Sequence, residues 1–181
     1  MKSARENLIH EHKAIEYALN ILKRMNERIE NNGDADYSDI NIFMEFLKEF
    51  VDKCHHGKEE DFLFPALEKA GIKKEGGPIE VMLSEHAQGW IYIQKMQNSI
   101  VENQVDKQLF IHASRDYIRL LRSHIQKENI VLFPFIDSKL SASEQNDLYD
   151  KFENHEEKVI GKDRHEALHH ILETLAGKYL E

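Results

Sequence analysis

The sequence has little that would cross-link, turn or anchor the chain. Its 181 residues include one cysteine, Cys54, so no intramolecular disulfide can form and a reducing cytoplasm is expected. Glycine (8) and proline (3) are scarce, which favours an all-α chain. No apolar run approaches membrane-spanning length, and no signal-peptide core follows the charged N-terminus. The net charge of −9 argues against binding to nucleic acid or to a membrane surface.

Two stretches repeat one pattern and carry the strongest functional signal. Residues 55–65 read HHGKEEDFLFP and residues 124–134 read HIQKENIVLFP. Each places a histidine and a glutamate four residues apart, and on a helix such residues share one face. These pairs are His55 with Glu59 and His124 with Glu128. Two helices of this kind that face each other would form a metal site inside a helical bundle.

Apolar periodicity, helix caps and breaks predict the helices. The expected caps are Ser3 with Glu6, Ser38, and Ser141 with Glu144. We expect them over residues 3–30, from Ser38 to Pro65, from Pro78 through Met96, from Phe110 to Pro134, from Ser141 to Gly161, and from there to about Leu180. Residues 31–34 and 103–106 are expected to be loops or polar connections. No linker is long enough to separate domains, so we expect one domain, residues 1–181. The bundle would span about 3–137, and a helical appendage about 141–181.

A wider internal repeat decides between neighbouring histidines. Residues 8–12 read LIHEH and residues 82–86 read MLSEH: each has two apolar residues, one variable residue and then Glu-His. Each of these segments precedes one of the two repeated stretches. The alignment puts His10 opposite Ser84 and His56 opposite Ile125, so neither is preferred as a ligand, and Cys54 falls opposite a serine. The predicted ligands are His12, His55, Glu59, His86, His124 and Glu128.

Four imidazoles and two carboxylates suit a pair of metal ions. Carboxylates can bridge two ions, and imidazoles suit iron, zinc, copper or nickel. So many nitrogen ligands make calcium a poor fit, and six ligands are too many for a structural zinc site. A pair of octahedral irons would keep open positions for O2, peroxide, nitric oxide or water. Without a metal, two buried glutamates would be costly.

These motifs resemble those of the hemerythrin-like (HHE cation-binding) family. The resemblance covers about residues 3–137 and rests on Glu-His at 11–12 and 85–86 and on the two repeated stretches. It implies an up-and-down four-helix bundle with two iron ions, oxo- or hydroxo-bridged, for which zinc or manganese could substitute. It also implies that Glu59 and Glu128 are the bridging carboxylates. Respiratory hemerythrins have a second histidine one turn from the first on the third helix, whereas this chain has Met82 and Trp90 there.

For several other residues, the sequence gives weaker evidence of a role in the metal site. Glu16 lies one turn after His12, and His165 and His169 are spaced four apart in the C-terminal segment, which resembles extensions that pack near the bundle opening in some hemerythrin-like proteins. Each of these residues could reach the metals, support a ligand or be solvated. Leu63 and Leu132 lie four residues beyond the repeated glutamates, where they could cap the metals or simply be core.

The sequence leaves three functions open. The favoured one is a metal-binding protein that binds O2 or nitric oxide, or holds iron, for sensing, storage or protection. The second is a di-iron enzyme that acts on peroxide or nitric oxide. The third is a helical interaction domain that requires no metal. A small diatomic ligand or peroxide is the expected partner in the first two cases, and the oligomeric state is not indicated.

Overall fold

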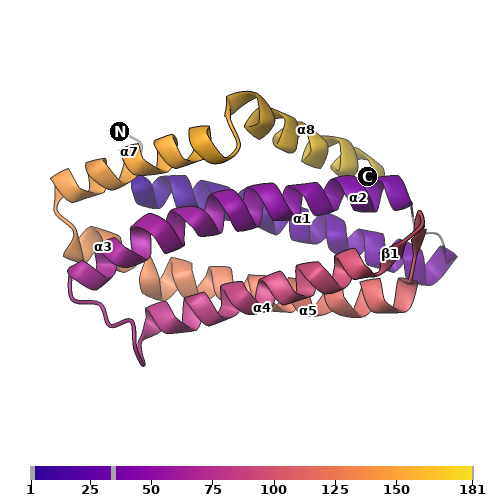
Figure 1. Cartoon of the computed structure of the whole chain (residues 1–181), viewed down its shortest axis with the longest axis horizontal. Coiled ribbons are helices and arrows are strands. Elements are labelled where there is room, and N and C mark those ends of the chain that lie inside the picture. Colours follow the sequence, from indigo (N-terminus) through magenta and orange to yellow (C-terminus); the bar gives the residue numbers. More distant parts are fainter. Residues whose placement is uncertain (1–2, 34–35, 181) are drawn as a thin grey trace.

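The computed structural model describes residues 3–33 and 36–180, and these form an all-α bundle (Figure 1). The bundle helices are α1 (Ala4–Asn32), α2 (Tyr37–Phe46), η1 (Leu47–His56), η2 (Glu59–Leu63), α3 (Phe64–Lys69), α4 (Pro78–Asn98), α5 (Lys107–Lys127), η3 (Glu128–Leu132) and α6 (Pro134–Lys139). Because η1 to η3 are π-helical stretches continuous with their neighbours, the elements make four long rods of alternating direction (Figure 1). Within the described residues, no helix combines the length and apolarity needed to cross a membrane.

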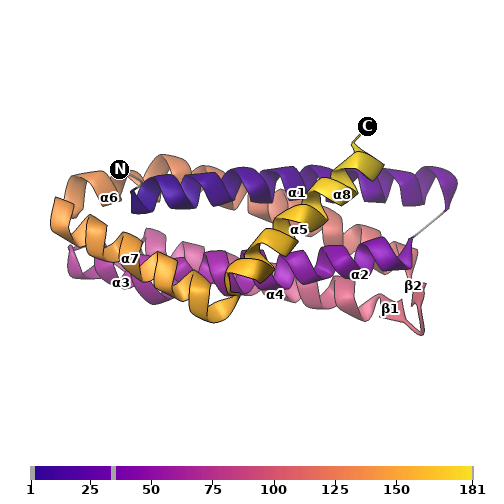
Figure 2. The ribbon, with the colours of Figure 1, turned by 90° about the horizontal axis from the view of Figure 1, so that it is seen from above.

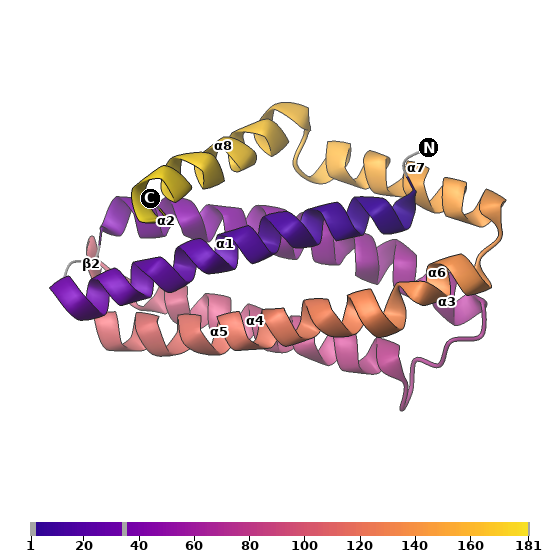
Figure 3. The same ribbon diagram turned by 180° about the vertical axis from the view of Figure 1, so that it is seen from behind.

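Two further helices cover one side of the bundle. They are α7 (Ala142–Val159) and α8 (Lys162–Tyr179). Both pack on α1; α7 also contacts η1 and η2, and α8 contacts α2. Figure 2 shows α8 crossing the bundle obliquely, and Figure 3 shows α4 and α5 on the side away from this pair. Gly161 separates the two helices with a backbone φ of 77°, as the expected break requires.

Side-chain caps set several helix ends. Ser3 and Glu6 form the expected capping box at the start of α1. The second helix, however, starts at Asp36, whose carboxylate accepts a hydrogen bond from the Asp39 N–H. The prediction that Ser38 caps this helix is therefore wrong, because Asp36, an equally good capping residue, lies two positions earlier. Gly33 ends α1 in the left-handed conformation; Asp34, part of the predicted loop, lies outside the described residues.

The helices with the repeated stretches continue past their prolines. Pro65 lies in the first turn of α3 and Pro134 in that of α6, although we expected the two helices to run only as far as these prolines. Just before them the hydrogen bonding changes to the π pattern, in which the Phe64 N–H donates to Glu59 O and the Phe133 N–H to Glu128 O. Since proline lacks an N–H and crowds the carbonyl four residues earlier, it favours this wider turn. Both wide turns start at a predicted metal ligand.

A short hairpin replaces the expected polar connection between the third and fourth rods. β1 (Ile100–Val101) pairs antiparallel with β2 (Gln104–Val105). Glu102 and Asn103 form the turn with φ values of 49° and 61°, the backbone that a two-residue hairpin requires. The strands are too short to affect the class of the fold.

The apolar core consists of two clusters with a polar layer between them. On α1, Leu8 belongs to one cluster and Ile15 to the other, and His12 lies between them. On α4, Met82 and Ile93 flank the buried layer in the same way. The predicted ligands thus occupy one level of the bundle, and apolar packing above and below that level shields it from water.

Candidate metal centre

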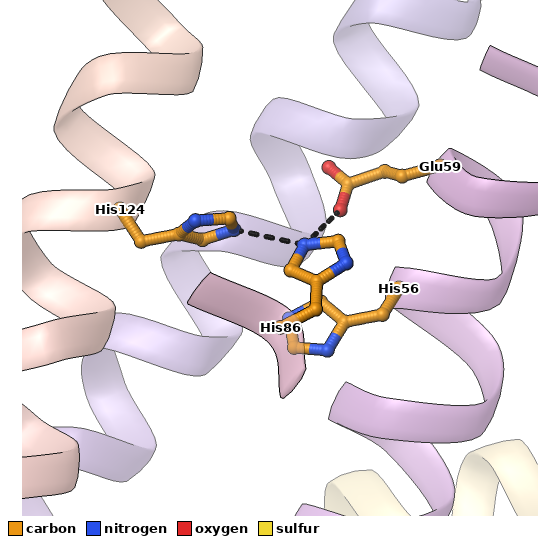
Figure 4. A group of neighbouring side chains, drawn as sticks. All are labelled: His56, Glu59, His86 and His124. Carbon is orange, nitrogen blue, oxygen red and sulfur yellow. Dashed lines mark hydrogen bonds and ion pairs between the residues drawn. The ribbon is translucent and has the colours of Figure 1, made fainter. Parts of the chain in front are cut away.

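All six predicted ligands lie in this buried layer. The side chains come from all four rods, and none is more than 4% exposed. Two groups of ligand atoms in this layer lie close enough to hold an ion, with the atoms in each group within 4.8 Å of one another; a third such group, Glu11, Cys54 and Glu156, includes one residue from beyond the bundle and none of the predicted ligands. The first group is His12, His55, Glu59 and Glu128, and the second is His56, Glu59, His86 and His124. The structure therefore brings the six predicted residues together and adds a seventh, His56. Figure 4 shows the second group.

Glu59 belongs to both groups and faces both with its carboxylate. Its Oε1 lies 3.5 Å from His55 Nε2 and 4.0 Å from His12 Nε2. Its Oε2 lies 3.3 Å from His86 Nε2, on the other side (Figure 4). A carboxylate that presents one oxygen to each of two ligand groups is arranged as a bridge.

Glu128 and the facing imidazoles close the layer. The Oε2 atom of Glu128 lies 3.2 Å from both His12 Nε2 and His124 Nε2. The Nε2 atoms of His86 and His124 are 3.1 Å apart (Figure 4). Two imidazole nitrogens at this distance need a shared proton or a cation, because their lone pairs repel each other.

Each of the four predicted histidine ligands is held by its other ring nitrogen. The Nδ1 donors and their acceptors are His12 with Asn129 Oδ1 (2.9 Å), His55 with Glu11 Oε2 (2.8 Å), His86 with Glu60 Oε1 (2.6 Å) and His124 with Glu85 Oε2 (3.0 Å). These bonds fix the tautomer and direct every Nε2 into the layer, as outer partners do in metal sites. The acceptors occupy equivalent positions in the two halves. Glu11 and Glu85 each directly precede a predicted histidine ligand, and Glu60 and Asn129 each directly follow a predicted glutamate ligand.

The lysine of each repeated stretch holds one of these acceptors. Lys58 Nζ donates to Glu11 Oε1 at 2.5 Å, and Lys127 donates to Glu85. The two lysines differ in burial, because Lys58 is fully buried whereas the side chain of Lys127 is 43% exposed. Lys58 also donates to Glu156 of α7 at 2.7 Å. The C-terminal appendage therefore reaches the predicted ligand His55 through a chain of charged groups.

The electrostatics of the layer favour positive charge. Burial opposes protonation of His86, but Glu59 and Glu60 outweigh it and raise the pKa of His86 to about 9. Burial likewise opposes charge on His124, yet Glu128 and Glu85 raise its pKa to about 10. Because burial and the neighbouring histidines lower the pKa of His56 well below its ordinary value, that ring is neutral.

Unpaired atoms in the layer fit a bound cation. Both carboxylate oxygens of Glu59 and of Glu128 are buried without a hydrogen-bond partner among the described residues, and so is His12 Nε2. The nearest imidazole nitrogens, 3.2 to 3.5 Å away, make no hydrogen bond to these oxygens, so the desolvation cost of the two buried carboxylates is only partly offset. Metal ions would satisfy these atoms and remove that cost, so the residues present fit the ions that the sequence predicts.

Other residues considered from the sequence lie away from the ligand groups. Glu16 and His10 are exposed, and neither belongs to a ligand group. His165 Nε2 lies 3.5 Å from Glu156 Oε1, and its ring is 4.7 Å from that of His169. Both rings pack against Phe50 of η1 and not against a ligand group. Leu63 and Leu132 are buried in the smaller apolar cluster. Phe133 and Phe64, which follow those leucines, stack on His12 and His86 with centroids 5.1 and 5.8 Å apart.

The sequence reasoning missed two features of the site. It set His56 aside because Ile125 occupies the equivalent position, yet the ring of His56 lies against His86 (Figure 4). It also used the glutamates at 11 and 85 only to recognise the repeat. Their recurrence before each ligand histidine, together with the recurring lysine, was the signal that could have assigned them as partners of the ligands.

Comparison with known proteins agrees with this geometry. The Hemerythrin HHE cation binding domain matches residues 3–136, and the chain belongs to this family. It is 25% identical over 168 residues to uncharacterized proteins of Mycobacterium bovis and Mycobacterium tuberculosis. The alignment covers 88% of this chain and 64% of those relatives. No solved structure matches the chain. The buried His/Glu groups and the family together fit a metal-binding hemerythrin-like protein.

Proposed function

We propose that this protein holds two iron ions in the buried layer and binds a small ligand there, O2 or nitric oxide, for sensing, storage or protection. The observation that carries the proposal is the pair of ligand groups that share Glu59, with one carboxylate oxygen turned to each. Iron is favoured because imidazole and carboxylate ligands suit it and because the family resemblance implies it. Iron supplies reversible redox chemistry and open positions for a small ligand.

Burial limits what can react at this centre. The ligand side chains are at most 4% exposed, and apolar clusters lie on both sides of them. A diatomic molecule or peroxide can diffuse to such a site, whereas a larger substrate cannot reach it. The Nδ1 hydrogen bonds of the histidines hold the imidazoles in one orientation, which keeps the ligand set in place when a small molecule binds. We place this function in the cytoplasm because the single cysteine, Cys54, is unpaired.

The proposal is tested by adding gases to the iron-loaded protein. The full chain is reconstituted with ferrous iron under anaerobic conditions, and its visible spectrum is recorded before and after nitric oxide or O2 is added. We expect two irons per chain and new bands that saturate with the gas. Glu128→Ala should lose both, whereas His112→Ala, which changes an exposed histidine, should keep them.

Three results would change the assignment. Two irons per chain without any spectral response to either gas would contradict ligand binding. Rapid and sustained breakdown of hydrogen peroxide would favour the alternative, a di-iron enzyme. A chain that binds no metal and is fully stable without it would favour the third function, a helical interaction domain.

A further inference from the structure

His56 is the one histidine of the layer whose ring has no hydrogen bond. It is 4% exposed, and neither ring nitrogen has a hydrogen-bond partner among the described residues. An imidazole buried in this way loses its bonds to water without compensation, at a cost of about 1–3 kcal/mol for one unsatisfied group. A residue with this cost in the middle of a ligand layer calls for a partner that is not a protein side chain.

The ring lies where a metal ligand would lie. It stacks on His86 with centroids 3.8 Å apart and an interplanar angle of 15°, and it lies edge-on to His124 at 5.8 Å (Figure 4). One of its nitrogens is within 4.8 Å of the ligand atoms of Glu59, His86 and His124. The Nδ1 atom of His56 faces Asp52 Oδ1 at 3.8 Å. The ring of His56 is therefore oriented like the other four histidine rings, each of which turns its Nδ1 atom toward an oxygen. Nε2 is thus the nitrogen available for a metal.

His56 is also the point where the two halves of the chain differ. The equivalent position in the second half is Ile125, which is buried in the larger apolar cluster. The other ligands, their acceptors and the stacked phenylalanines all have counterparts. The second ligand group therefore offers three imidazoles and the carboxylate of Glu59, whereas the first offers two imidazoles and two carboxylates.

We propose that His56 is a ligand of one metal ion and makes the two metal positions unequal. The inference rests on the proposed two-metal centre but not on the identity of its gas ligand. Later divalent metals prefer imidazole, and harder ions such as Mn2+ prefer carboxylate. A late divalent metal therefore fills the position beside His56 first, and the position beside Glu128 binds it more weakly.

The test is a titration of the metal-free full chain with Co2+ against a coloured competing chelator. Wild type should bind two ions in two steps of different affinity. His56→Ile, which places the residue of the other half at this position, should weaken the tighter step by about tenfold or more, since even the loss of a partner of a metal ligand costs that much. The control His10→Ala changes an exposed histidine and should leave both steps unchanged.

Stability of the metal-free protein separates a ligand from a structural histidine. If His56 serves the metal, metal-free His56→Ile should be as stable as wild type or more so, because isoleucine has no polar atoms to desolvate. If His56 serves the fold, the variant should be less stable without metal. Unchanged binding steps in His56→Ile would overturn the proposal, and so would an equal loss of both steps.

A second measurement needs no variant. Long-range 1H–15N spectra of the wild-type chain with two Zn2+ bound should show five histidine rings with a metal-bound nitrogen. Four such rings would overturn the assignment of His56 while leaving the two-metal centre intact. Failure of the wild-type chain to bind metal at all would instead overturn the proposed function, and the role of His56 with it.

Discussion

The two lysines of the repeated stretches offer a paired test of how the ligand layer is supported. Lys58 and Lys127 occupy equivalent positions, and each donates to a glutamate that holds a ligand histidine. Lys58 is fully buried, and its removal would leave Glu11, 4% exposed, without its cationic partner. Breaking a buried pair in this way costs about 3–5 kcal/mol. The Lys127 pair is partly solvated, because Lys127 is 43% exposed and Glu85 is 15% exposed, and we expect it to contribute nearer the range of surface pairs, about 0–1 kcal/mol.

Urea unfolding of Lys58→Met and Lys127→Met, both metal-free, measures the difference directly. We expect a loss of about 3–5 kcal/mol in the free energy of unfolding for Lys58→Met and less than about 1 kcal/mol for Lys127→Met. Metal affinity should also fall in Lys58→Met, because Glu11 then no longer holds His55 in place. Equal effects of the two substitutions on stability would refute the reasoning, since the difference depends on burial and on the contact with α7.

Three further predictions concern pH, the cysteine and the appendage. In the metal-free protein, burial opposes protonation of His86 and His124, but the carboxylates raise their pKa values to about 9 and about 10 from 6.5. The two rings share one proton between their Nε2 atoms. The stability that this proton contributes is full below pH 6.5 and is lost as the pH rises through 9 to 10. Unfolding free energies that do not fall between pH 7 and pH 10 would contradict this account. Burial raises the pKa of the Cys54 thiol to about 12, so a thiol reagent at pH 8 should label it only after unfolding; fast labelling of the native chain would be inconsistent with the structure. Phe152→Ala on α7 removes a fully buried ring and should lower the free energy of unfolding by about 3–5 kcal/mol, and a loss below about 1 kcal/mol would show that α7 is not docked.

Much of the fold could be read from local patterns. The capping box at Ser3 and the one at Ser141 were predicted correctly because a cap and its partner are only three residues apart. The cap of the second helix was wrong because Asp36 and Ser38 are both good capping residues, and the choice depends on where the helix packs. The π-helical turns beside Pro65 and Pro134 were missed because the helical period alone does not reveal a wider turn.

The candidate site shows the same division between local and long-range information. The ligand spacing on each helix and the internal repeat predicted which residues would converge. The contact of Lys58 with Glu156 was not predictable, since Glu156 reaches Lys58 only through the docking of α7. His56 was set aside by an alignment that assumes equivalent halves, and the structure places it at the position where the halves differ.

We propose that each of the two ligand groups that share Glu59 holds one metal ion. Crystals of the full chain, reconstituted anaerobically with ferrous iron, can be measured on both sides of the iron absorption edge. Two anomalous difference peaks in the buried layer are predicted, one beside His12 and His55 and one beside His86 and His124. No peak in the layer, or iron held only at the surface, would contradict the account.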